Sequence, residues 1–210
     1  NTMKSPAFIF RKCSLMIVLL TAAFLTACSD KVDESDIYTF KGETITSYLE
    51  KSENFTDFAY ILSRVKLSKR SESTIAQLLS ARGNYTVFAP TNDAVQHYLD
   101  SVYQTTDYDI TQIPDSVADY IARNAIIDCE DLNAYQTTDF NVGTLERTNM
   151  DDRYITVDFD TINGGNLATI INNSARIVLP DIEVYNGYIH GVNQVLSLSR
   201  ATVPALIESA

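Results

Sequence analysis

Tryptophan is absent from the 210 residues, and histidine and cysteine are rare, with two and three copies. Neither His97 nor His190 lies in a His-Glu-x-x-His arrangement or a comparable zinc-binding pattern. The sequence also contains no Gly-x-Ser-x-Gly element, no phosphate-binding glycine-rich loop and no Rossmann glycine run. These absences argue against an enzyme, and we predict no catalytic residue, no metal ion and no cofactor.

Basic residues are also scarce after position 28. The chain holds 16 Lys and Arg against 27 Asp and Glu, a formal net charge of −11. Lys4, Arg11 and Lys12 precede position 28 and no acidic residue does, so the remainder carries 13 basic and 27 acidic residues, a net charge of −14. Phosphate backbones and anionic lipid surfaces repel such a chain. Nucleic acid is therefore excluded as a partner.

The first 27 residues have the pattern of a signal peptide. An uncharged run from Cys13 to Ala27 follows the basic residues, and as a helix it would span about 22 Å, less than the roughly 30 Å of a hydrocarbon core. This favours a cleaved signal over a membrane span. The run ends in Leu25-Thr26-Ala27-Cys28, which resembles the bacterial lipobox. We therefore predict removal of residues 1–27 and lipidation of Cys28, with several acyl chains giving durable anchoring.

Residues 28–41 are predicted to form an acidic, flexible tether. The stretch from Ser29 to Lys41 is polar and has little apolar pattern. An acidic segment directly after a lipidated cysteine resembles the surface-export signal of Bacteroidota lipoproteins, and Ser29 after Cys28 agrees with outer-membrane delivery. We therefore expect a lipoprotein anchored in the outer membrane and exposed at the cell surface.

Cys129 is the one thiol that remains if Cys13 is removed and Cys28 is acylated. The mature chain would then have no internal disulfide, so its stability must come from core packing. The acidic neighbours Asp128, Glu130 and Asp131 should raise the thiol pKa. We therefore interpret Cys129 as a passive residue and not as a nucleophile.

Helical spacing marks the first half of the domain that begins near residue 42. Apolar residues recur at helical intervals around 45–49, 55–65 and 75–79, and Gly83 is a candidate stop for the third of these helices. The strand-like Tyr85–Ala89 follows, with Tyr85, Val87 and Ala89 on one face and Thr86 and Phe88 on the other. Few of its residues are polar, which predicts a strand covered on both faces.

A helix should begin immediately after this strand. Pro90 lacks the amide proton that a β-ladder needs, so it ends the strand. The hydroxyl of Thr91 can cap the next helix, and Asp93 lies in its first turn, where the helix dipole favours negative charge.

A further helix is predicted to start at a cap formed by Asp115 or Ser116, and its phase puts Asn124 on the buried face. An unpaired buried amide would cost about 1–3 kcal/mol. We therefore expect the side chain of Asn124 to bond to backbone of the nearby strand-to-helix motif or to a polar residue such as Thr91 or Asp93.

The second half of the domain has the period of strands. Residues 154–160 alternate, with Ile155, Val157 and Phe159 on one face, and 163–166 have turn chemistry. Further strand candidates are 167–171, 175–179, 182–185 and 188–196. Helices that precede strands in this way predict an α+β fold.

Two stretches resemble the signatures of the fasciclin domain family. Tyr85–Val95 reads YTVFAPTNDAV and is similar to the first signature, and Ile189–Leu196 reads IHGVNQVL and is similar to the second. The resemblance covers residues 42–198, and residues 199–210 would then form a C-terminal tail. It implies a wedge-like β-sandwich flanked by helices. The motif positions, structural or interacting, are Thr86, Phe88, Pro90, Thr91, Asp93, Asn124, His190 and Asn193.

The sequence departs from the family pattern at two of these positions. Asn124 occupies the place of the histidine in the Tyr-His pair that the family usually has between its signatures. Asn193 stands where the second signature has aspartate. His190 matches a family strand position, and we interpret it as a packed, hydrogen-bonded side chain.

A calcium-binding loop and a sugar-stacking surface are two further possibilities that the residues only partly match. The segment Asp158–Gly164 is acidic, but Ile162 takes the fifth position of the calcium-loop template and Thr169 the twelfth, so exposed acids on a strand and turn are the better interpretation. Twelve tyrosines could stack on sugars, but most fall at predicted core positions, and tryptophan, the strongest stacking side chain, is absent.

The resulting functional hypothesis is a non-catalytic protein-binding or adhesion module with an outer-membrane or surface protein as its partner. The alternative is an accessory lipoprotein that captures a glycan or nutrient beside an outer-membrane uptake complex.

Overall fold

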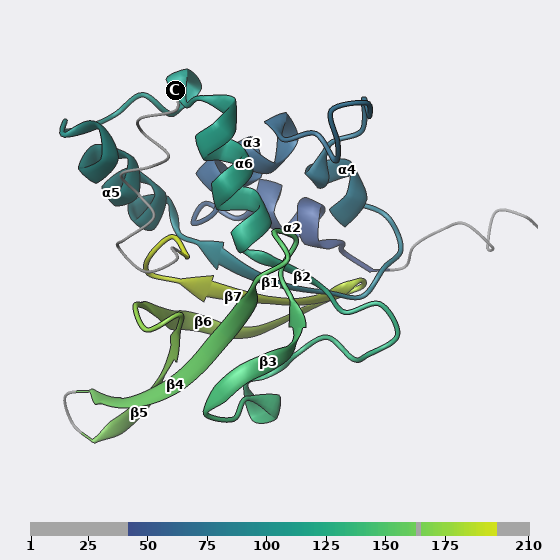
Figure 1. Ribbon diagram of the computed structural model, residues 1–210, viewed down its shortest axis with the longest axis vertical. Helices are drawn as coiled ribbons and strands as arrows, with labels where there is room; N and C mark the ends of the chain where they lie inside the picture. The colour runs from purple at the N-terminus through teal and green to yellow at the C-terminus, as the bar shows by residue number, and fades with distance from the viewer. Residues whose placement is uncertain (1–41, 163–164, 197–210) are drawn as a thin grey trace, which may run out of the picture. The chain divides into compact units, whose positions relative to one another are not determined.

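The computed structural model describes residues 42–162 and 165–196 (Figure 1). Cys28, the predicted signal peptide, the tether and the tail 199–210 lie outside these residues. Within the described ranges, every helix is too short or too polar to span a membrane. The helices are α2 (Ile45–Lys51), α3 (Thr56–Arg64), α4 (Ile75–Leu79), α5 (Asn92–Tyr103), η2 (Ile110–Gln112), α6 (Asp115–Asn124) and η3 (Thr137–Asp139).

The described strands form one seven-stranded sheet in the order β2-β1-β7-β6-β5-β4-β3. All neighbours are antiparallel except β1 and β7, which run parallel. The amide of Met150, just after β3, donates to the carbonyl of Ile126 in β2 at 2.9 Å and nearly closes the sheet. The strands are β1 (Tyr85–Pro90), β2 (Ile126–Asp128), β3 (Gly143–Thr148), β4 (Tyr154–Ile162), β5 (Asn166–Ile171), β6 (Ala175–Val184) and β7 (Gly187–Val192).

The predicted α+β architecture with flanking helices is confirmed. Figure 1 shows helices α2 to α6 gathered on one side of the sheet, next to β1 and β7. The hydrophobic core has two parts. One lies between the helices and the sheet and includes Phe55, Phe58, Leu99 and Ile121. The other lies inside the curved sheet and includes Phe140, Ile155, Val157 and Val192.

Strand β1 separates the two parts of the core, because its alternate residues enter different parts. Tyr85, Val87 and Ala89 pack on the helical side, while Phe88 packs inside the sheet. All six residues of the strand are buried. The predicted two-sided strand, including the direction of each side chain, is therefore confirmed.

The abrupt step from β1 to α5 rests on side-chain hydrogen bonds. The hydroxyl of Thr91 accepts from the amide of Ala94 at 3.3 Å, as predicted for a cap. Asn92 adds a tertiary link, because its Oδ1 accepts from the amide of Asp57 at 3.1 Å and its Nδ2 donates to the carbonyl of Glu53 at 2.8 Å. The start of α5 is thus fixed to the start of α3.

The predicted end of one helix and the predicted cap at the start of another were wrong. Helix α4 ends at Leu79 with Ser80 as its cap, so Gly83 is not the stop. A Cβ at Gly83 would instead lie 2.1 Å from the ring of Tyr85, which explains the glycine. Helix α6 follows Pro114 with no side-chain cap, so neither Asp115 nor Ser116 caps it.

The strand predictions need three corrections. The segments 175–179 and 182–185 form the single strand β6, with an irregular register between Leu179 and Ile182. Asp181 there has a φ of 54°, which produces a bulge without ending the strand. Strand β7 ends at Val192 and not at 196, and the sequence did not indicate the short strands β2 and β3.

Candidate functional site

The residues of the two signatures meet on the inner side of β1 and β7. These strands pair in parallel, with Phe88 opposite His190. The ring of Phe88 stacks on the His190 imidazole with 5.5 Å between centroids. Thr86 and His190 both bond to the segment 132–140, which lies between β2 and β3 and includes η3. We call this segment the latch loop.

Thr86 holds the latch loop by its hydroxyl oxygen, which accepts from the amide of Tyr135 at 2.8 Å. The residue is fully buried. The thiol of Cys129 lies 3.5 Å from the same hydroxyl. Burial raises the pKa of the Cys129 thiol, the hydrogen bond with Thr86 opposes this, and the charge of Asp128 adds to the rise more weakly. The raised pKa was predicted, but burial and not the acidic neighbours is its main cause.

His190 holds the same loop from β7. Its Nδ1 accepts from the amide of Asp181 at 3.2 Å, so Nε2 carries the proton and donates to the carbonyl of Tyr135 at 2.9 Å. Burial lowers the pKa of His190 below its usual value, against weaker opposing effects of the Tyr135 bond and the Asp181 charge. The imidazole is therefore neutral near pH 7, and His190 is the packed, hydrogen-bonded residue that we predicted.

Other side chains, which the sequence analysis missed, complete the hold on this loop. The carboxylate of Asp181 accepts from the amide of Thr137 at 2.7 Å and also from its hydroxyl. Asn84 donates to the carbonyl of Leu132 and accepts from the amide of Ala134. The sequence pointed to these residues only weakly, through the Pro180-Asp181 pair inside a strand-like run and through Asn84 directly before the first signature.

Asn124 is almost fully buried in α6, as predicted, but its partners are not the expected ones. Its Nδ2 donates to the carbonyl of Tyr120 at 2.9 Å, and its Oδ1 accepts from Nδ2 of Asn149 at 3.2 Å. Neither Thr91 nor Asp93 contacts it through a hydrogen bond. The pair of asparagines joins α6 to the turn that follows β3.

The remaining signature residues lie where the two strands end. Pro90 is the last residue of β1, and the amide of Thr91 continues the ladder by donating to the carbonyl of Val192 at 3.1 Å. Asp93 is exposed in the first turn of α5. Asn193 is exposed, and its Oδ1 accepts from the amide of Arg176 at 2.7 Å. These residues lie at the ends of the two strands and at the start of α5, and they do not converge on a pocket.

The acidic residues of β4 make local contacts. The carboxylates of Asp158 and Asp160 each accept from the next residue's amide, at 2.8 and 2.7 Å. Within residues 42–162 and 165–196, His, Cys, Asp and Glu side chains do not gather in groups of three that could hold a metal ion.

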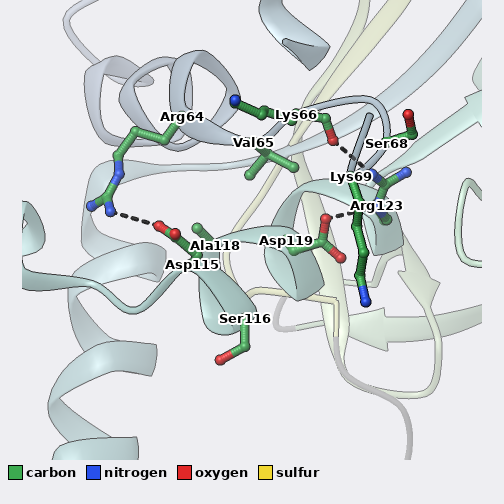
Figure 2. A pocket seen from close by; sticks show the side chains of 10 residues that line it. All are labelled: Arg64, Val65, Lys66, Ser68, Lys69, Asp115, Ser116, Ala118, Asp119 and Arg123. Atoms are coloured by element: carbon green, nitrogen blue, oxygen red, sulfur yellow. Dashed lines mark hydrogen bonds and ion pairs between the residues drawn. The ribbon is translucent and has the colours of Figure 1, made fainter. Parts of the chain in front are cut away.

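An open groove of about 520 Å³ lies between α3, the loop after it and α6, and Figure 2 shows the side chains that line it. Both arginines in this groove already form ion pairs. Arg64 pairs with Asp115 at 2.8 Å, and Arg123 pairs with Asp119 at 2.8 Å. Arg123 also donates to the carbonyl of Lys66 at 2.9 Å. We interpret the contacts of Arg64 with Asp115 and of Arg123 with Lys66 as structural links that hold α6 against α3 and the loop after it.

A second open groove, of about 620 Å³, lies between the latch loop and the β6–β7 hairpin. Aromatic, acidic and amide side chains line it. They include Tyr135, Tyr185, Tyr188, Asp139, Glu146, Glu183, Asn84 and Gln136. We call it the tyrosine groove. Gln136 joins its two walls by donating to the hydroxyl of Tyr188 at 2.8 Å.

The comparisons with known proteins agree on the fold. The model of the fasciclin domain family matches residues 53–198. Among solved structures, the chain is similar to a FAS1 domain pair from the insect cell adhesion molecule fasciclin I, with 18% identity and a TM-score of 0.52. The similarity covers 73% of this chain and 50% of that one, so the chain spans about half the length of that domain pair. None of the curated proteins matches.

Proposed function

The chain belongs to the fasciclin domain family, and we propose that it is a lipid-anchored module that docks another protein at the surface of the outer membrane. Fasciclin domains are generally linked to adhesion and are generally non-catalytic. The insect protein that shares the fold is a cell adhesion molecule.

One observation carries the docking proposal: the signature side chains of Thr86 and His190 are directed inward and hold the latch loop, which forms one wall of an external groove. Thr86, Asn124 and His190 are at most 1% exposed. Each bonds to backbone of the domain itself. Their chemistry therefore serves the scaffold, and a partner would contact the surface that this scaffold supports. The tyrosine groove is such a surface, and tyrosine is enriched at protein interfaces.

Membrane attachment is supported by the lipobox-like end of the apolar run at Cys28. If the thiol is acylated, the protein partitions with membranes, and Cys28→Ala moves it to the soluble fraction or leaves the signal uncleaved. Cell fractionation with mass spectrometry of the amino-terminal peptide tests this. A soluble wild-type protein with an unmodified residue 28 would refute the anchor.

Crosslinking on intact cells, followed by mass spectrometry, tests the docking itself. We expect recovery of an outer-membrane or surface protein, and equal recovery with Asp158→Asn, because that exposed carboxylate makes only a local contact. Raised salt should weaken the complex only moderately, since exposed charges mainly adjust the association rate. Recovery of no membrane protein would refute the docking proposal.

Capture of a glycan or nutrient beside an uptake complex is the second candidate function. Three tyrosines and three side-chain amides of the tyrosine groove favour it, because aromatic rings and amides are suited to sugars. A glycan array tests it directly, since a protein-docking module leaves the array blank. An uptake transporter encoded beside this protein would support the second candidate.

A further inference from the structure

We propose that the tyrosine groove binds a segment of the partner protein that carries lysine or arginine. This inference rests on the proposed docking function and names the site and the chemistry of the partner. The groove has two walls, the latch loop with Tyr135 and Asp139, and the β6–β7 hairpin with Glu183, Tyr185 and Tyr188. A third element, β3, contributes Glu146.

The charge of the groove has a single sign. Asp139, Glu146 and Glu183 line it, and no lysine or arginine does. Among the residues that the structure describes, neither Glu146 nor Glu183 takes part in an ion pair. Nearby acids differ, because Glu130 and Asp131 are both neutralised by the guanidinium of Arg147. A cationic side chain would supply the charge that the groove lacks.

The aromatic rings point to the same class of partner. Three tyrosines line the groove, and Tyr185 among them is 42% exposed. An ammonium or guanidinium group over a tyrosine face gains the cation–π attraction, and neighbouring carboxylates add charge-assisted hydrogen bonds. A neutral sugar would use the ring and could donate hydroxyl hydrogen bonds to the carboxylates, but it would leave their negative charge uncompensated. The charge therefore favours a basic protein segment over a glycan.

The groove is already formed in the free protein. Thr86 and His190 hold Tyr135 by its amide and carbonyl, and Asp181 holds Thr137. These bonds fix the latch loop against β1, β6 and β7. A partner therefore need not order this wall when it binds, which lowers the entropic cost of association.

The groove also lies beside the point where the chain enters the described domain. The amide of Tyr185 donates to the carbonyl of Glu43 at 2.8 Å. A Cβ at Gly42 would lie 2.9 Å from Cβ of Tyr185, so the backbone runs directly past this ring. An anchor at Cys28 would keep this part of the domain within a short tether of the membrane. A partner in the same membrane is then within reach.

Binding of a defined probe to the full-length chain in uncharged detergent micelles tests the inference. The probe is a fluorescein-labelled octapeptide of alternating lysine and glycine, with the glutamate–glycine octapeptide as its counterpart. We expect the double variant Glu146→Gln/Glu183→Gln to raise the Kd of the lysine peptide about tenfold, or about 1.4 kcal/mol. The control Glu50→Gln/Glu53→Gln removes the same charge from exposed sites outside the groove and should change it by less than about twofold.

A third variant, Tyr185→Leu, separates the ring from the charge. We expect it to weaken the lysine peptide, because leucine keeps apolar area but has no π face. Equal losses in the groove and control variants would overturn the inference, since binding would then reflect overall charge. Binding of a neutral oligosaccharide that depends on Tyr185, with no binding of the lysine peptide, would overturn it in favour of a glycan.

Crosslinking with the same variants separates this inference from the docking function. Loss of the crosslinked partner in Glu146→Gln/Glu183→Gln, with the control unchanged, supports the groove. A partner recovered equally with both variants overturns the groove and leaves the docking function standing. No partner even with the wild-type chain refutes the docking function.

Discussion

Replacement of Asn186 by alanine should cost more stability than any other single change of an asparagine in this domain. Asn186 lies at the turn between β6 and β7 and is 1% exposed. Its Nδ2 donates to the carbonyls of Leu79 and Ala81, at 2.7 and 2.9 Å. Its Oδ1 accepts from the amide of Ile45 at 2.9 Å. One side chain thus joins the end of α4 and the start of α2 to the sheet.

The expected loss follows from these three bonds. A buried group without its partner costs about 1–3 kcal/mol. The bonds to Leu79 and Ile45 are buried, while the one to Ala81 is partly exposed and water can replace it. We therefore expect Asn186→Ala to lower the free energy of unfolding by about 3–5 kcal/mol. At about 2–4 °C per kcal/mol, the melting temperature should fall by roughly 10 °C.

Urea unfolding followed by far-ultraviolet circular dichroism measures this loss, with tyrosine fluorescence as the second probe because the chain has no tryptophan. The matched control is Asn193→Ala. It removes a bond of the same kind, from Oδ1 to the amide of Arg176 at 2.7 Å, but at an exposed position. We expect a loss below about 1 kcal/mol there. Equal losses in the two variants, at unchanged m-values, would refute the claim that burial sets the cost.

The sequence at Cys28 and the contacts of three other positions support four further predictions. Cys28→Ala should move the protein out of the membrane fraction, as fractionation will show. Stability should fall as the pH drops below about 6.5, because burial lowers the folded pKa of His190 and the unfolded chain then binds more protons than the folded one. Urea midpoints at pH 7.5 and 5 measure this loss of stability, and the loss should be smaller in His190→Gln. Asn124→Leu should cost about 1–3 kcal/mol in urea unfolding, because the buried amide of Asn149 loses its bond to the Asn124 side chain and keeps only the one to the Asn124 carbonyl. Gly187→Ala should lower the melting temperature far more than Gly143→Ala, because both have positive φ but only at Gly187 would the Cβ lie 1.8 Å from a carbonyl of β1.

Local patterns in the sequence determined much of the fold. The alternation of β1 predicted which of its residues share a face and that both faces are covered, and this holds; the structure showed that one face meets the helices and the other the sheet interior. The cap at Thr91 and the buried phase of Asn124 were also predictable. These features depend on neighbours within a few residues, because strand alternation, helical period and capping are properties of the local backbone.

Tertiary structure alone decided which groups meet. Asn124 was expected near the first signature, but a turn 25 residues away supplies its partner. His190 reaches a carbonyl 55 residues earlier, and Asn186 reaches an amide 141 residues earlier. The tyrosine groove likewise joins two loops, a hairpin and a strand. No local pattern encodes such pairings, because they depend on how β1, β6 and β7 align after the chain has folded, and a side-chain hydrogen bond requires that alignment to within a fraction of an ångström.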